Sequence, residues 1–90
     1  MTTTTRTVRV GSAHGLHARP AKLLAQAAIE AGVPVTIAKD AGAPANAASI
    51  LGIIALGIEQ GDYVTLTVEG DGAEDLLDRL AELLASDHDA

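Results

Sequence analysis

The order of hydrophobic and polar residues along the chain predicts four strands. Residues 7–10 and 63–69 alternate polar and apolar side chains, as half-buried strands do. Residues 33–38 are rich in β-branched residues, which favour extended backbone. The turn-forming sequence of residues 40–44 follows, and a short extended piece is expected to run from there to Ala47.

Three other stretches repeat apolar residues at helical spacing. The first starts near Pro20, whose missing N–H costs nothing in a first helical turn, and stops at Gly32. Ser49 can cap a short middle helix that runs through Leu56. The last helix has the clearest apolar stripe, and its other face is acidic. The residues of that stripe are Leu76, Leu77, Leu80, Leu83 and Leu84.

These elements follow the order β-α-β-β-α-β-α and predict an α+β fold. Strands with one apolar face, combined with three helices that each carry an apolar face, favour an open-faced two-layer sandwich. Its four-stranded, mainly antiparallel sheet is expected to be covered on one face by the three helices. We expect a single domain over residues 1–90, with a frayed N-terminus at residues 1–5 and a flexible tail at residues 86–90.

The amino-acid composition limits how the core can be built, which chemistry is available and where in the cell the protein is expected. Of its 90 residues, 48% are hydrophobic but only Tyr63 is aromatic, so aliphatic side chains must fill the core. There is no cysteine, which excludes disulfides and thiolate chemistry. The sequence shows no leader and no run near the ~20 apolar residues that span a membrane, so a soluble, cytoplasmic protein is expected. The net charge of −6 argues against nucleic-acid binding.

The middle helix departs from the one-sided pattern of the other two. Its apolar residues have almost no polar residue between them, and a short helix cannot bury every side against one sheet. Either the helix is wedged between its neighbours, or some of these side chains form an exposed docking patch for a partner. The residues concerned are Ile50, Leu51, Ile53, Ile54 and Leu56.

The stretch AHGLHARPAKLL, residues 13–24, places His14 and His17 directly before the first helix. A metal site would need further ligands, and no Cys, Asp or Glu lies near the pair in sequence, so no metal is expected. A hydrolase base is disfavoured as well, because no Ser or Cys nucleophile motif accompanies the histidines.

His17 suits a different role, that of a phosphoryl acceptor. A helix N-terminus offers unpaired N–H groups and a partial positive charge, and both favour a bound phosphate. Arg19 could add a planar, charged donor fork to that phosphate. The positive helix end should also keep His17 neutral and nucleophilic. The plainer alternative, that His17 only caps the helix, stays open on this argument.

Three segments of the chain resemble the HPr family, the histidine-containing phosphocarriers of the bacterial sugar phosphotransferase system. GLHARPA, residues 15–21, is similar to the active-site motif of that family. NAASILGIIALGIEQGD, residues 46–62, is similar to its regulatory-serine segment. VEGDGAEDLLDRLAELL, residues 68–84, is similar to its closing strand, acidic turn and leucine-striped helix. The resemblance runs from Val8 to Leu84 and covers nearly the whole domain.

The resemblance implies a carrier that is itself a substrate rather than an enzyme, and that needs no cofactor. Such proteins accept a phosphoryl group from phosphorylated Enzyme I, which draws it from phosphoenolpyruvate, and pass it to a histidine of sugar-specific Enzyme IIA. The resemblance puts that group on Nδ1 of His17, with Arg19 stabilising it. It assigns Ile50, Leu51 and Ile54 to the surface that docks both partners. A monomer fits a carrier that visits two partners with one face.

Two positions depart from the pattern of the family. His14 stands where relatives usually carry Asn, Ser or another residue, so it receives no catalytic role. A local polar contact or a capping role is favoured, and a role next to the phosphate is the secondary alternative. Ala48 replaces the lysine that usually precedes the regulatory serine, which alters the recognition signal for a serine kinase. Ser49 is therefore a candidate regulatory phosphosite whose plainer interpretation is a helix N-cap.

Two other functions stay open beside the sugar-linked carrier. An HPr-like regulatory module would bind and control a transcription factor or an enzyme without transferring phosphate. Such a module could lack the motif histidine, whereas His17 is present here with Arg19 and Pro20, which favours a carrier. A carrier for a nitrogen-linked or dihydroxyacetone-linked phosphotransferase system would have the same motif.

Overall fold

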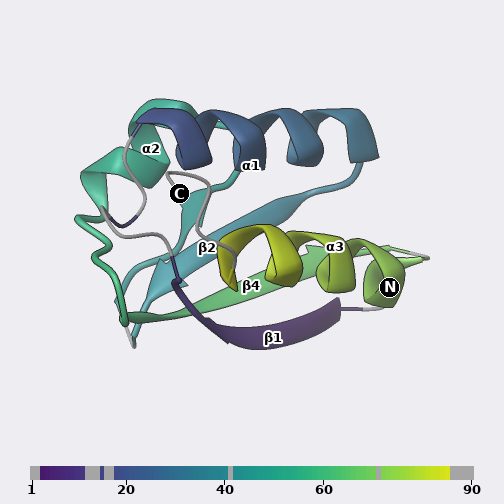
Figure 1. Cartoon of the computed structure of the whole chain (residues 1–90). Coiled ribbons are helices and arrows are strands. Elements are labelled where there is room, and N and C mark those ends of the chain that lie inside the picture. The colour runs from purple at the N-terminus through teal and green to yellow at the C-terminus, as the bar shows by residue number, and fades with distance from the viewer. Residues whose placement is uncertain (1–2, 12–14, 16–17, 41, 71, 86–90) are drawn as a thin grey trace.

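The computed structural model describes residues 3–11, 15, 18–40, 42–70 and 72–85, and confirms the predicted order of elements. Its four strands form one antiparallel sheet in the order β1-β4-β2-β3. Three helices lie on one face of this sheet (Figure 1). The strands are β1 (Thr3–Arg9), β2 (Val35–Lys39), β3 (Ala45–Asn46) and β4 (Tyr63–Glu69), and the helices are α1 (Ala18–Ala31), α2 (Ile50–Ala55) and α3 (Ala73–Ala85).

The core lies between the sheet and the helices. Along β4, Val64, Leu66 and Val68 are fully buried, while the residues between them are half-buried on the open face of the sheet. The leucine stripe of α3 packs against this layer, and Leu77, Leu80 and Leu84 are almost completely buried. The apolar residues whose spacing predicted β4 and α3 therefore form much of the core.

The N-terminal strand is longer than the sequence predicts. Residues 1–5 were expected to be frayed, but β1 starts at Thr3 and pairs with β4 from Thr3 opposite Glu69 to Arg9 opposite Tyr63. Threonine is β-branched and stabilises a strand once a partner is available, and here the partner lies more than fifty residues away in sequence. The expected tail at residues 86–90 lies outside the described part of the chain.

The two longer helices lie across the same face of the sheet, and the short helix α2 lies at one end of α1. Helix α3 packs on β1 and β4, α1 packs against α3, and α2 packs against α1 and β3. In Figure 1, α2 lies beside the N-terminal end of α1. The topology therefore brings residues near position 18 next to residues near position 50, far apart in the chain.

Candidate functional site

The first turn of α1 provides the positive end of the candidate site. The helix begins at Ala18, the residue after His17, and its first turn contains no acidic side chain that would offset the helix dipole. Arg19 is exposed in this turn, whereas Pro20 is buried and anchors the turn in the core. His14 and His17 themselves fall outside the described residues, so the predictions for these two side chains stay predictions.

Gly15 brings the chain before α1 into direct contact with the segment after α2. Its backbone has φ +68°, in the left-handed region that favours glycine. It is buried, and a Cβ atom at this position would lie 2.2 Å from the carbonyl oxygen of Ile58 and 2.7 Å from the Cα of Glu59. Only glycine allows this approach, so the GLHARPA motif needs Gly15 for packing as well as for conformation.

The apolar surface of α2 is exposed in part, as the sequence predicted. Ile53 is completely buried, but the relative exposure is 39% at Ile50, 81% at Leu51 and 41% at Ile54. Isolated exposed apolar residues are common, but three on one short helix form a contiguous patch of the kind that marks protein contacts. We refer to Ile50, Leu51 and Ile54 as the α2 patch.

Ser49 has the geometry of a helix N-cap. Its backbone is extended, with φ −108° and ψ 113°, and its hydroxyl oxygen accepts a hydrogen bond of 3.1 Å from the backbone N–H of Gly52. The preceding turn is closed by Asn46, whose side-chain oxygen accepts a hydrogen bond of 2.9 Å from the N–H of Ala48. The capping interpretation of Ser49 is confirmed, while its phosphorylation stays a prediction.

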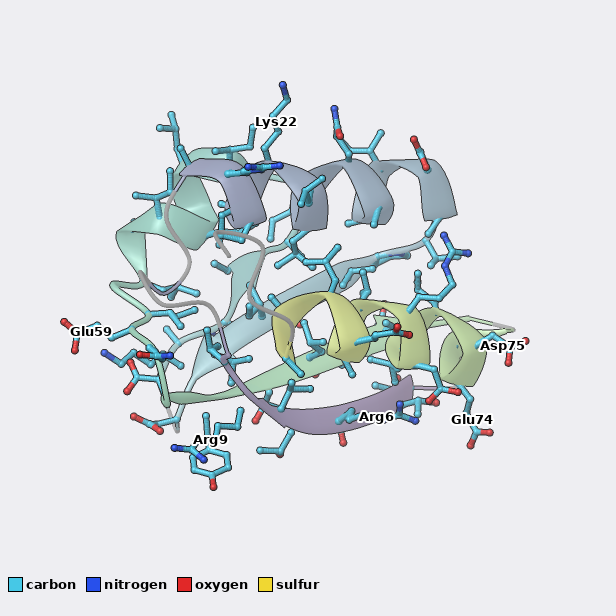
Figure 2. All side chains as sticks on the ribbon, in the orientation of Figure 1. Arg6, Arg9, Lys22, Glu59, Glu74 and Asp75 are labelled. Atoms are coloured by element: carbon cyan, nitrogen blue, oxygen red, sulfur yellow. The ribbon has the colours of Figure 1, made fainter. Side chains whose placement is uncertain are left out.

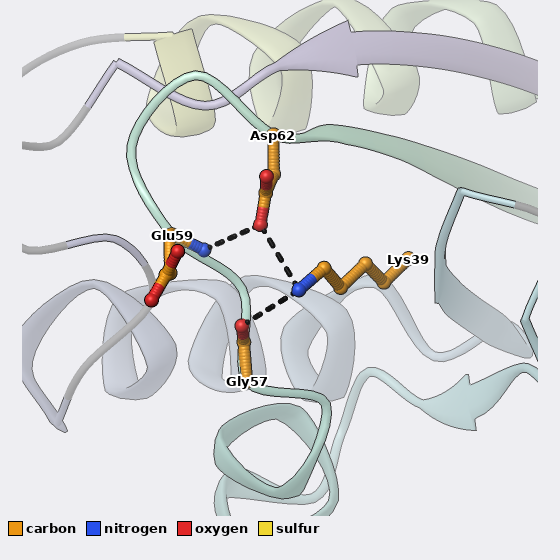
Figure 3. Close-up of polar contacts among 4 residues, drawn as sticks. All are labelled: Lys39, Gly57, Glu59 and Asp62. Carbon is orange, nitrogen blue, oxygen red and sulfur yellow. Dashed lines mark hydrogen bonds and ion pairs between the residues drawn. The ribbon is translucent and has the colours of Figure 1, made fainter.

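A polar cluster that the sequence analysis missed fixes the chain between α2 and β4 (Figure 3). The Lys39 ammonium donates to the carbonyl oxygen of Gly57 at 3.1 Å and lies 3.2 Å from Oδ2 of Asp62. The same Oδ2 accepts a hydrogen bond of 2.8 Å from the backbone N–H of Glu59. This N–H and then the hydrogen bond from Lys39 hold the pKa of the Asp62 carboxyl below its ordinary value.

The lowered pKa of Asp62 predicts a stability difference that depends on pH. A carboxyl group whose pKa falls on folding stabilises the folded state above its unfolded pKa and loses that effect as pH falls through its folded pKa. We expect Asp62→Asn to lower the urea midpoint at about pH 7, and to lower it less near pH 2, well below the ordinary Asp pKa of ~3.9. Equal losses at both pH values would contradict the ion pair of Lys39 with Asp62.

Sequence spacing could not reveal this cluster, because Lys39 ends β2 and Asp62 lies in the turn before β4, and the pattern of residues 46–62 that contains Asp62 says nothing of Lys39. The described residues contain no group of three or more metal-binding side chains. In the part of the chain that the structure describes, no helix is long and apolar enough to cross a membrane.

Comparison with known proteins identifies the family. The family model described as "PTS HPr component phosphorylation site" matches residues 4–86. The chain belongs to the HPr family. Among relatives of the HPr family, the "Phosphocarrier protein HPr" of Streptomyces coelicolor is 52% identical over 80 residues, which cover 89% of this chain and 86% of that protein.

Solved structures of HPr proteins have the same fold. The phosphocarrier protein HPr from Bacillus anthracis superposes with a TM-score of 0.86 at 39% identity, and the match covers 93% of this chain and 99% of that one. Crh, the Bacillus subtilis catabolite repression HPr, superposes with a TM-score of 0.73 at 32% identity, covering 99% and 100% of the two chains. The α+β open-faced sandwich predicted from the sequence is therefore the HPr fold.

Proposed function

We propose that His17 accepts a phosphoryl group from phosphorylated Enzyme I on its Nδ1 atom and passes it to a histidine of Enzyme IIA, with Arg19 stabilising the group. Membership of the HPr family makes the protein a phosphocarrier of the phosphotransferase system that works with other proteins of this system. The observation that carries the proposal is the acid-free first turn of α1, with an exposed Arg19, beside the exposed α2 patch.

The transfer needs little from this protein besides an acceptor and a positive environment. The imidazole nitrogen attacks the phosphorus of the donor phosphohistidine, a new N–P bond forms as the donor N–P bond breaks, and the leaving nitrogen recovers its lone pair. The phosphoryl oxygens carry the negative charge throughout, so N–H groups of a helix N-terminus and a guanidinium stabilise them. The α2 patch supplies apolar area for docking on a helix that packs against α1.

The test of this function is incorporation and release of one phosphoryl group. The protein is incubated with phosphoenolpyruvate and Enzyme I, and its intact mass is measured before and after addition of Enzyme IIA. We expect a gain of one acid-labile phosphoryl group that is lost to Enzyme IIA. No gain with Enzyme I would contradict the carrier and favour an HPr-like regulatory module. A gain that a nitrogen-linked or dihydroxyacetone-linked partner removes, and a sugar-linked Enzyme IIA does not, would assign the protein to one of those systems.

Replacing Arg19 by alanine is expected to slow the transfer without unfolding the protein. Arg19 is exposed, so the fold loses little, whereas a charge-assisted hydrogen bond of about 1.5–3 kcal/mol to the moving phosphoryl group is lost. We expect the rate of transfer from Enzyme I to fall about 10–100-fold. Stopped transfer reactions analysed by mass give this rate, and an unchanged rate in Arg19→Ala would remove Arg19 from the proposed site.

Leu51→Glu is expected to weaken docking of both partners. Leu51 is 81% exposed, so the substitution should change the stability of the fold by less than about 0.5 kcal/mol. A charge in an apolar contact should raise the Kd for Enzyme I about thirtyfold, or about 2 kcal/mol. The matched control is Ile29→Glu, because Ile29 is 63% exposed at the other end of α1. Equal Kd values for the two variants would show that the α2 patch does not dock partners.

A further inference from the structure

The segment from Gly57 to Asp62 forms a hydrogen-bonded turn beside the candidate site. The N–H of Asp62 donates to the carbonyl oxygen of Glu59 at 3.0 Å, and the N–H of Glu59 donates back to the Asp62 carboxylate at 2.8 Å. These two bonds close the turn from both sides. We refer to residues 57–62 as the 57–62 platform.

Lys39 connects this platform to the sheet. It is the last residue of β2, where it pairs with Val64, and its ammonium bridges Gly57 at one end of the platform and Asp62 at the other (Figure 3). The side chains of Lys39 and Asp62 are 33% and 27% exposed, so the pair is shielded from solvent over most of its surface. Partly buried charges attract each other more strongly than fully exposed ones, so the ion pair of Lys39 with Asp62 should be stronger than an ordinary surface ion pair.

The platform in turn holds the chain that leads to His17. The N–H of Val10 donates to the carbonyl oxygen of Asp62 at 2.9 Å, and the N–H of Gly61 donates to the carbonyl oxygen of Val10 at 2.8 Å. Five residues later Gly15 packs on the backbone of Ile58, with no room for a Cβ atom. The platform therefore supports this segment at two points, both upstream of α1.

We propose that Lys39 is a positioning residue for phosphoryl transfer, because it fixes the 57–62 platform on which Val10 and Gly15 rest. This inference depends on the proposed function of His17. Lys39 acts through the backbone of Gly57 and the carboxylate of Asp62, not through contact with the phosphoryl group. Reactions between two bound groups lose rate steeply when the acceptor is displaced, by as much as ~100-fold for 1 Å. Loosening of the platform should therefore lower the rate of transfer rather than the affinity for Enzyme I.

The test compares Lys39→Met with Lys39→Arg and a control that removes an equivalent cation elsewhere. The control is Arg6→Met, because Arg6 on β1 forms an ion pair with Asp78 on α3, remote from the platform. Figure 2 shows Arg6 well away from Glu59, which belongs to the platform. For each variant, transfer from phosphorylated Enzyme I is measured over a range of carrier concentrations, which separates the maximal rate from the half-saturating concentration.

We expect Lys39→Met to lower the maximal rate about tenfold while the half-saturating concentration changes less than about twofold. Arg6→Met should keep the maximal rate of the unchanged protein within about twofold, and Lys39→Arg should restore at least about half of it, since arginine keeps the charge and can donate to both acceptors. Equal rates in Lys39→Met and Arg6→Met would overturn the inference. A higher half-saturating concentration at an unchanged maximal rate would also overturn it, because Lys39 would then act in docking.

Two further outcomes are separated by the same measurements. If Lys39→Met does not fold, as circular dichroism would reveal, Asp62→Asn replaces it, because an amide oxygen can still accept from Glu59 while the ion pair is lost. An unchanged maximal rate in Asp62→Asn would then overturn the inference. If the unaltered protein takes up no phosphoryl group, the proposed function itself fails, and that result is independent of Lys39.

Discussion

Gly15→Ala is expected to destabilise the protein more than any other single alanine substitution in the GLHARPA motif. A left-handed backbone costs a non-glycine residue about 1–2 kcal/mol. The new methyl group would also meet the carbonyl oxygen of Ile58 at 2.2 Å, so the chain before α1 or the 57–62 platform must move. Forced packing of this kind costs about 1–3 kcal/mol more.

The control for this substitution is Gly32→Ala. Gly32 has nearly the same conformation, φ +70° against +68°, but nothing lies within 4 Å of a Cβ atom there. The two variants therefore share the conformational cost and differ only in the contact with Ile58. We expect thermal unfolding to occur about 10 °C lower in Gly15→Ala than in Gly32→Ala, which corresponds to about 2 kcal/mol. Equal midpoints would mean that Gly15 does not pack on the platform.

Gly15→Ala should also separate stability from function. Because Gly15 precedes His17 by two residues and rests on the platform, displacement of the backbone at Gly15 should slow phosphoryl transfer even where the protein is fully folded, well below its unfolding midpoint. Gly32 lies at the far end of α1, so Gly32→Ala should transfer at the rate of the unchanged protein under these conditions.

His17→Ala is expected to have the largest effect on function, a complete loss of phosphoryl uptake. Each of the other proposed residues contributes through charge, docking or position, and its loss leaves an acceptor in place. Replacement of His17 by alanine removes the proposed acceptor itself. Since His17 precedes the helix and Pro20 anchors its first turn in the core, we expect the variant to remain folded. Circular dichroism and the urea midpoint check this expectation.

The elements that local pattern determines were predicted well. The alternation of residues 63–69 defines β4 to the residue, because each inward side chain is fully buried and each outward one is not. Ser49 was predicted as the cap of α2, because a hydroxyl directly before an apolar run finds its hydrogen-bond partner in the first turn of the helix. Here that partner is the N–H of Gly52. The exposed α2 patch was predicted as one of two alternatives, because a six-residue helix cannot bury apolar side chains on all of its faces.

The features that the sequence did not reveal depend on partners far away in the chain. Residues 3–5 extend β1 only because β4 offers them hydrogen bonds, and a threonine run has no local signal for that pairing. Lys39 meets Asp62 because the last residue of β2 pairs with Val64 near the start of the antiparallel strand β4, which places Asp62 next to Lys39. Gly15 could be recognised as a turn residue, but its contact with Ile58 follows from the packing of α2 beside α1.

We propose that one end of the molecule both docks the partner proteins and holds the phosphoryl group. In the proposed function, the exposed apolar side chains of the α2 patch dock the partners, and Arg19 with the N-terminal N–H groups of α1 stabilises the phosphoryl group. The platform beneath them is fixed by Lys39 and Asp62. A carrier that serves two partners in turn can use the same surface for both, since it only has to present one histidine. We therefore expect a monomer, with an elution volume in size-exclusion chromatography that does not change on phosphorylation.

We propose that His17, and not His14, carries the phosphoryl group. This assignment is tested by the intact mass of the unchanged protein, His17→Ala and His14→Ala after incubation with phosphoenolpyruvate and Enzyme I. We predict the gain of one acid-labile phosphoryl group in the unchanged protein and in His14→Ala, and no gain in His17→Ala. A gain that persists in His17→Ala, or one that disappears in a folded His14→Ala, would contradict the claim.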